Sequence, residues 1–127
     1  MSRQLISPRP DANFSQAVRV GDVIHVAGQV AMNEQRELVG EGDAEAQARQ
    51  CFSNLERVLS EAGASIADLV RVTVYLVGAE HYAGYAAAKR DYLSEALPAG
   101  TAVIVAGLMD PRFLIEIDAV AIASSVS

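Results

Sequence analysis

The last third of the chain contains two apolar segments typical of strands, and one of them carries acidic residues inside its apolar run. The first segment covers 98–108 (PAGTAVIVAGL) and the second covers 115–121 (IEIDAVA). Glu116 and Asp118 lie two residues apart, so on a strand they share one face. Burying an unpartnered carboxylate costs free energy. A sheet that contains this segment must therefore give these acids partners or use them in a site.

The spacing of apolar residues predicts that strands and helices alternate along the chain. Two strands flank Gly21–Asp22, which has the composition of a two-residue hairpin turn. A helix is expected to begin after Asp43, a suitable N-cap, and to end at Gly63. The remaining elements are expected as a strand over 70–77, a helix over 80–97 that Pro98 ends, and strands over 101–107 and 113–122.

The order ββαβαββ predicts one α+β domain over residues 1–127, with a mixed sheet and both helices on one of its faces. A chain of 127 residues is long enough to bury one core. The strands carry apolar residues on both sides, so the face without helices also needs a cover. Another copy of the chain is the expected cover.

The composition limits which partners the protein can bind and in which cellular compartment it is expected. The net charge of -6, from 16 acidic and 10 basic residues, argues against binding to nucleic-acid phosphates. Cys51 is the only cysteine, so no disulfide forms within the chain and a cytoplasmic location is expected. No apolar run is long enough for a signal peptide or a membrane span, so no membrane partner is expected. No Cys and His lie at ligand spacing, so no metal site is expected.

Several segments together resemble the YjgF/RidA family, the reactive intermediate deaminases, also labelled L-PSP endoribonucleases. The resemblance covers about residues 15–123 and rests on VAGQ at 26–29, AQARQ at 46–50 with NL at 54–55, TVY at 73–75 and IEIDAVA at 115–121. It implies a chorismate-mutase-like fold and a homotrimer with clefts between its subunits. It also implies hydrolysis of small enamines or imines, such as 2-aminoacrylate, to a keto acid and ammonia, without a metal or an organic cofactor.

The resemblance further implies which positions form the site. Glu116 falls on the family's water-positioning acid, and Gly28 with its neighbouring backbone is preserved. The family's arginine, which pairs with the substrate carboxylate, falls on Gly100, so that charged contact is missing. Three further family positions, a tyrosine, an asparagine and a small Cys or Thr, fall on Phe14, Ala86 and Ala102.

Arg112 has two interpretations. It lies four residues before Glu116, so a regular strand would place both on one face and let Arg112 supply the charge missing at Gly100. The favoured alternative is an exposed loop arginine after Asp110–Pro111, a sequence typical of a turn.

Each of the other candidate residues also has a purely structural interpretation. Glu116 is interpreted as functional and Asp118 as structural, and either acid has cross-strand pairing with Arg71 or Arg19 as its structural explanation. Cys51 is expected to be a core thiol. The tyrosines at 82, 85 and 92 follow helical spacing and are expected in the core or between subunits.

Three functions compete at this point. The first is a hydrolase of the YjgF/RidA type that acts on an enamine or imine other than 2-aminoacrylate, because Gly100 removes the carboxylate contact. The second is a non-catalytic trimer that binds a small metabolite in the same clefts, as a sensor or scavenger. A ribonuclease or translation inhibitor is disfavoured by the acidic net charge.

Overall fold

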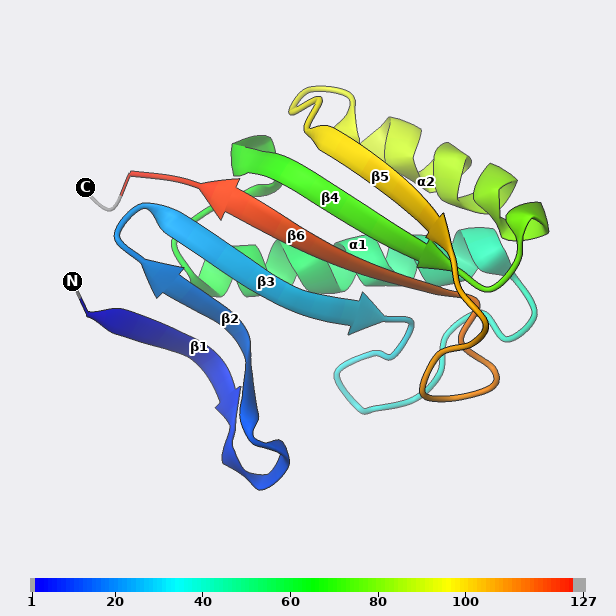
Figure 1. Cartoon of the computed structure of the whole chain (residues 1–127), viewed down its shortest axis with the longest axis horizontal. Coiled ribbons are helices and arrows are strands. Elements are labelled where there is room, and N and C mark those ends of the chain that lie inside the picture. Colours follow the sequence, from blue (N-terminus) through cyan, green and yellow to red (C-terminus); the bar gives the residue numbers. More distant parts are fainter. Residues whose placement is uncertain (1, 125–127) are drawn as a thin grey trace.

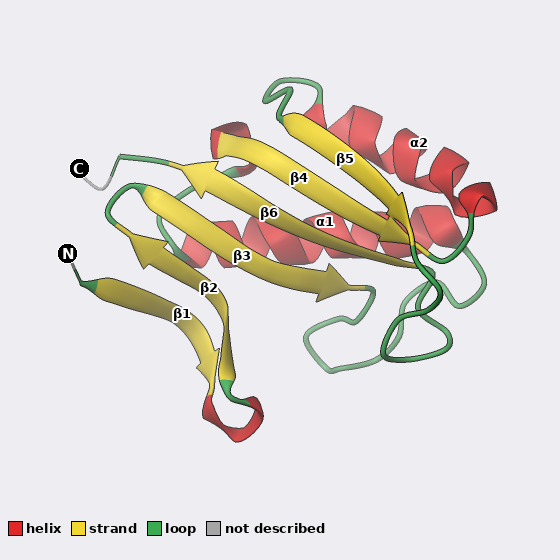
Figure 2. Ribbon diagram, in the orientation of Figure 1, coloured by secondary structure: helices red, strands yellow, loops and turns green. Residues whose placement is uncertain are grey.

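The computed structural model describes residues 2–124 and forms a six-stranded mixed sheet with two helices on one face (Figures 1 and 2). The strand order is β1-β2-β3-β6-β4-β5, and only the β4–β5 pair is parallel among these strands. The elements are β1 (Arg3–Arg9), β2 (Phe14–Val20), β3 (Val23–Val30), α1 (Ala44–Glu61), β4 (Leu69–Leu76), α2 (Tyr82–Leu93), β5 (Ala99–Ile104) and β6 (Ile115–Ile122). The predicted α+β fold with a mixed sheet is therefore confirmed.

The first strand was not predicted from the sequence. β1 pairs antiparallel with β2 at the edge of the sheet, and Pro8 lies opposite Ser15. Its sequence, RQLISPR, lacks a regular apolar alternation and contains a proline, which removes a backbone donor. An edge strand tolerates proline because one side of its backbone needs no sheet partner. The observed order is thus βββαβαββ rather than ββαβαββ.

The predicted hairpin and first helix are confirmed. Val20 pairs with Val23 across the two-residue turn, where Gly21 has a φ of 61°. Asp43 caps α1, since its Oδ1 accepts a hydrogen bond of 3.0 Å from the backbone N–H of Ala46. Gly63 follows the helix with a φ of 83°, which suits a residue without a side chain.

The second helix is shorter than the expected range 80–97. A single 3₁₀ turn, Ala79–His81, precedes α2, and the helix ends at Leu93. Residues 94–97 form a turn in which the Leu97 N–H bonds the Leu93 carbonyl and Leu97 adopts a φ of 47°. The positive φ of Leu97 turns the chain toward Pro98 and β5. The helical spacing of apolar residues therefore continues in the sequence to Leu97, although the helix itself ends at Leu93.

The sheet has one face under the helices and one face without them. On β6 the buried residues alternate with Glu116, Asp118 and Val120, which are only half-buried. The buried set consists of Ile115, Ile117, Ala119 and Ala121. They pack with the apolar stripe of α1, which includes the fully buried Phe52 and Leu55. The acids of β6 are therefore on the helix-free face, because side chains alternate along a strand.

Two buried polar side chains of α1 fix loops near the start of β6. Gln47 is fully buried, donates to the carbonyls of Gly40 and Arg112, and accepts from the Leu114 N–H at 2.9 Å. Asn54 donates to the carbonyls of Val30 and Met32, both at 2.9 Å. Gln47 and Asn54 thus tie α1 to the end of β3 and to the neighbouring loops.

Candidate functional site

Glu116 lies near the start of β6, between β3 and β4. Its cross-strand neighbours are Val30 on β3 and Tyr75 on β4. The carboxylate is half-buried, and no described residue donates a hydrogen bond to it or pairs with it. Its pKa is raised above the ordinary value, first because of burial and then because of the negative charge of Asp118. Glu116 is thus a partly desolvated acid whose oxygens are available to another molecule.

Gly28 provides the space in which this carboxylate lies. The register between β3 and β6 shifts between Val26 and Gln29, so Gly28 is part of a β-bulge. A Cβ at Gly28 would overlap Oε2 of Glu116 and come within 2.8 Å of its Cδ. The absence of a side chain at position 28 is what allows the Glu116 carboxylate to rest against the β3 backbone. The structure therefore brings together two of the residues that the sequence singled out.

Asp118 has a different environment from Glu116. The Tyr75 hydroxyl donates a hydrogen bond of 2.8 Å to Oδ2 of Asp118. This bond, together with burial, raises the pKa of Tyr75, which stays a neutral donor. The expected structural role of Asp118 agrees with this contact, but its partner is a tyrosine and not an arginine.

The two arginines considered as partners of these acids lie elsewhere. Arg19 is buried and donates to the carbonyls of Gly21 and Ala62, at 2.9 and 2.7 Å, and to that of Ala123. It faces the helices because Ala17 and Arg19 are the buried positions of β2. Arg71 donates to the hydroxyl of Thr101 at 3.0 Å. The pairing of Glu116 with either arginine is therefore wrong.

Gly28→Ala is expected to push the Glu116 carboxylate out of its position, because the added methyl group would overlap it. The displaced carboxylate becomes better solvated, so the pKa of Glu116 should fall back toward its ordinary value. An NMR titration of the Glu116 side-chain carboxyl carbon measures this change. Gly107→Ala is the matched control, since a Cβ at Gly107 meets no atom within 4 Å. An unchanged Glu116 pKa in Gly28→Ala would contradict this packing.

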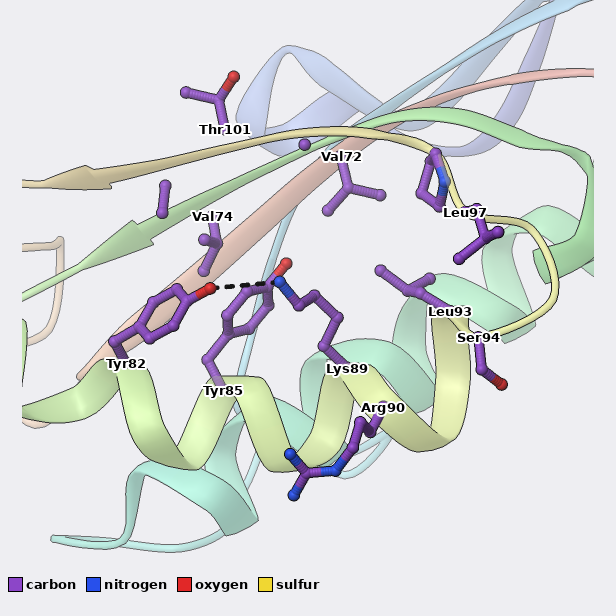
Figure 3. Close-up of a pocket in the computed structure, with 13 residues that line it drawn as sticks. Val72, Val74, Tyr82, Tyr85, Lys89, Arg90, Leu93, Ser94, Leu97 and Thr101 are labelled. Atoms are coloured by element: carbon purple, nitrogen blue, oxygen red, sulfur yellow. Dashed lines mark hydrogen bonds between the residues drawn. The ribbon is translucent and has the colours of Figure 1, made fainter.

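A cavity of about 580 Å³ lies on the other face of the sheet, between α2 and strands β4 and β5 (Figure 3). Gly100 and Ala102 line it, because they pair with Val72 and Val74, whose side chains point toward the helices. A Cβ at Gly100 would have no neighbour closer than 4.0 Å. The glycine therefore leaves open space where a side chain would fit.

Three polar side chains of α2 point into this cavity. Figure 3 shows Tyr82, Tyr85 and Lys89 directed from the helix toward Val72 and Val74. Lys89 donates a hydrogen bond of 3.3 Å to the Tyr82 hydroxyl, and its ammonium lies 5.5 Å and 5.3 Å from the ring centroids of Tyr82 and Tyr85. Burial, followed by the effect of Tyr82, raises the pKa of Tyr85 to about 12, so Tyr85 remains neutral.

The predicted role of the tyrosines in packing is confirmed for two of them. The rings of Tyr85 and Tyr92 stack on Phe52, with centroid distances of 5.9 and 5.0 Å. Tyr82 differs, since it is 42% exposed and borders the cavity. Cys51 is a buried free thiol as expected, and burial raises its pKa.

The predicted site residues thus fall into separate places within the chain. Glu116 and Gly28 lie together on the helix-free face, whereas Gly100 and Ala102 line the cavity under α2. Ala86 lies half-buried on α2, outside the residues that line the cavity. Phe14 begins β2 and is 43% exposed. A single sheet separates the two main groups, so they do not come together within one chain.

Arg112 does not share a face with Glu116. It lies in the loop before β6, and that strand begins only at Ile115, so strand alternation does not apply to it. Its guanidinium binds Asp110 through two hydrogen bonds, of 3.0 and 2.8 Å, and lowers the pKa of Asp110 to about 2. The idea that Arg112 replaces the charge missing at Gly100 is therefore not supported, and the loop interpretation describes it.

Lys89 is the residue of the cavity that analysis of the sequence did not identify as a candidate. It is the only lysine of the chain, and it lies on a helix face that is otherwise tyrosine, leucine and alanine. A lysine on an apolar helix face was the available signal. Within residues 2–124, no three His, Cys, Asp or Glu side chains are grouped so that they would hold a metal ion. No helix in that part of the chain is long and apolar enough to cross a membrane.

Comparisons with known proteins agree with this fold. The family described as Endoribonuclease L-PSP matches residues 5–123. A RutC family protein of Pyrococcus abyssi is 38% identical over 91% of this chain and 90% of its own length. A 3-aminoacrylate deaminase, RutC, of Acinetobacter baylyi is 32% identical over 91% of this chain and 90% of its own. The crystal structure of RidA from an Antarctic Psychrobacter species is 32% identical, with a TM-score of 0.85 over 94% of this chain and 99% of that one.

Proposed function

This chain belongs to the Endoribonuclease L-PSP family, which includes the YjgF and RidA proteins, and we propose that it hydrolyses a small enamine or imine to a carbonyl compound and ammonia. The observation that carries this proposal is the Glu116 carboxylate, which is half-buried, rests against Gly28 and has no side-chain partner among the described residues. The relative named 3-aminoacrylate deaminase supports an enamine as the class of substrate.

The chemistry requires a group that exchanges protons with water beside the reacting carbon. The enamine first takes a proton on carbon and loses one from nitrogen, which gives an imine. Glu116 then removes a proton from water as the water oxygen bonds to the imine carbon, and the nitrogen gains a proton. Collapse of the resulting carbinolamine forms the C=O bond and releases ammonia. A carboxylate with a raised pKa suits both the removal and the return of a proton.

The proposed assembly is a homotrimer with sites between subunits. It is supported by the placement of Glu116 and Gly100 on opposite faces of one sheet, because only a second subunit can bring the two faces together. It is also supported by apolar side chains exposed on edge strand β5, where Val103 is 37% and Ile104 is 56% exposed. No nucleic-acid substrate is proposed, since the net charge is -6.

The direct test is ammonia release from imines generated in the assay by an amino-acid oxidase from several parent amino acids. We expect the protein to accelerate hydrolysis of imino acids with longer side chains. The rate with 2-aminoacrylate should be at least about thirtyfold lower than for family members that carry the arginine, because the arginine contact is missing at Gly100 and a three-carbon acid has no side chain to contact the cavity wall. Light scattering of the same sample should give the mass of a trimer.

The outcomes separate the candidate functions. Acceleration with none of the imines, in a sample that is folded and trimeric, would contradict the hydrolase. Ligand binding without turnover would favour the second candidate, a non-catalytic trimer that senses or scavenges a metabolite. That candidate is supported by Gly100, which replaces the residue expected to hold the substrate.

A further inference from the structure

Lys89 is a positive charge inside a largely apolar cavity, and no carboxylate of residues 2–124 pairs with it. The described ion pairs of the chain involve arginines and His81, and Lys89 takes part in none of them. Within the described part of the chain, its one polar contact is the hydrogen bond it donates to the Tyr82 hydroxyl. An ammonium group has three donors, so two of them remain without a partner among the described residues.

The two tyrosines hold the ammonium in a defined place. Lys89 lies over both rings, within 5.5 Å of each centroid, and the negative faces of the rings attract it. Tyr85 is itself fixed, because it is buried and stacks on Phe52. A lysine held in this way loses less freedom when it binds a ligand than a lysine in solvent does.

One side of the cavity is suited to an apolar group. Val72, Val74 and Leu93 form its inner wall, and all three are buried. Gly100 and Ala102 occupy little of the space on the β5 side. The cavity of about 580 Å³ is far larger than a three-carbon acid needs. A cation at one point and an apolar wall beside it together fit an anion with a hydrocarbon tail.

We propose that Lys89 is the anion anchor of this cavity and selects substrates or ligands that join a carboxylate to an aliphatic side chain. The carboxylate oxygens accept hydrogen bonds from the two unused donors of the ammonium. The aliphatic part lies against Val72, Val74 and Leu93. This inference rests on the proposed function, which identifies the cavity as part of the substrate site. Lys89 on α2 then supplies the positive charge for the carboxylate that Gly100 on β5 does not supply.

The test compares binding of 2-oxohexanoate with binding of 2-hexanone, which has the same carbonyl and tail length without the carboxylate. Calorimetry should show that the wild type binds the acid at least about tenfold more tightly than the ketone, because hydrogen bonds to charged groups are strong. Lys89→Met should remove this preference and leave ketone binding nearly unchanged. Lys89→Arg keeps the charge and should keep most of the preference.

Arg112→Met is the matched control, since it also removes one positive charge but lies in the Asp110 loop away from the cavity. It should bind both probes as the wild type does. A second readout uses the single lysine of the chain. Lysine labelled with ¹³C at Cε marks Lys89 as the only lysine and keeps all three donors of its ammonium, and titration with 2-oxohexanoate should shift its NMR signal.

The failures of the two proposals differ. Equal acid preference in the wild type and in Lys89→Met, with an unmoved lysine signal, would overturn the role of Lys89 even if imines are hydrolysed. Binding of the acid that depends on Lys89, in a protein that hydrolyses no imine, would keep the anion site and overturn the hydrolase. Loss of the preference in Arg112→Met to the same degree would show a general charge effect and overturn the anchor.

Discussion

Glu116→Gln is expected to reduce imine hydrolysis by about a hundredfold or more, because glutamine keeps the shape of the side chain but takes no proton from water. The variant should keep the wild-type mass in solution and should still bind the acid probe, because Lys89 lies on the other face of the sheet. The measurement is the rate of ammonia release at saturating substrate, with light scattering on the same sample. Asp118→Asn is the matched control, since its amide oxygen still accepts the hydrogen bond from Tyr75.

The Glu116→Gln substitution is also expected to affect the thermal stability of the protein. Burial raises the pKa of Glu116 in the folded protein, so the folded state binds this proton more tightly than the unfolded chain. The stabilising contribution of the protonated group is complete below the unfolded pKa and is lost as pH rises through the raised folded pKa. Glutamine stays neutral, so Glu116→Gln should unfold at the same or a slightly higher temperature than the wild type at neutral pH.

The rate of imine hydrolysis should also depend on whether Glu116 is protonated. The wild-type rate is expected to fall as pH decreases through the raised pKa of Glu116, because the protonated acid does not accept a proton from water. An inactive Glu116→Gln protein that dissociates or unfolds at neutral pH would contradict the catalytic role and would make Glu116 a structural acid. A variant that turns over at the wild-type rate would also contradict that role.

Two inactive variants are expected to restore activity when their subunits are mixed. Glu116→Gln disables the helix-free face, and Gly100→Phe fills the cavity under α2, where the glycine has open space. If each site joins one face of a subunit to the opposite face of its neighbour, random trimers of equal parts should contain intact sites at about one quarter of their clefts. Dissociation and reassembly of the mixture, followed by the ammonia assay, measures the recovery.

The control mixture pairs Glu116→Gln with Gly28→Ala, which is also expected to be inactive because the added methyl group displaces the Glu116 carboxylate. Both changes affect the same face of the sheet, so every cleft of every mixed trimer carries one defect, and no activity should return. Each variant treated alone should also stay inactive. Recovery in the control mixture, or none in the test mixture after exchange of subunits is demonstrated, would show that the site does not form between the two faces.

The elements with strong local signals were predictable from the sequence. The alternation in β6, the N-cap at Asp43 and the turn at Gly21 each depend on neighbouring residues, and all three appear as expected. β1 was missed because pairing with β2 stabilises it, and its own sequence has no apolar alternation. The end of α2 was missed because the positive φ of Leu97 leaves no clear mark in the sequence.

The candidate site was predictable only residue by residue. Glu116 and Gly28 were singled out separately, but their contact depends on a β-bulge that brings the backbone under the carboxylate. The position of Gly100 behind the sheet depends on the register between β4 and β5. The orientation of Lys89 depends on the packing of two tyrosines. Each of these is a long-range relation that residue spacing does not encode.

The candidate site is divided between the two faces of one sheet, so its activity should depend on protein concentration. If both faces are needed, a dissociated subunit retains its fold but has no complete site. Specific activity should then fall on dilution, although the folded fraction stays constant, and the midpoint would report the dissociation constant of the assembly. A ligand that touches both faces would bind the trimer alone and would shift that midpoint to lower protein concentration. The supply of substrate would thus stabilise the enzyme form that consumes it.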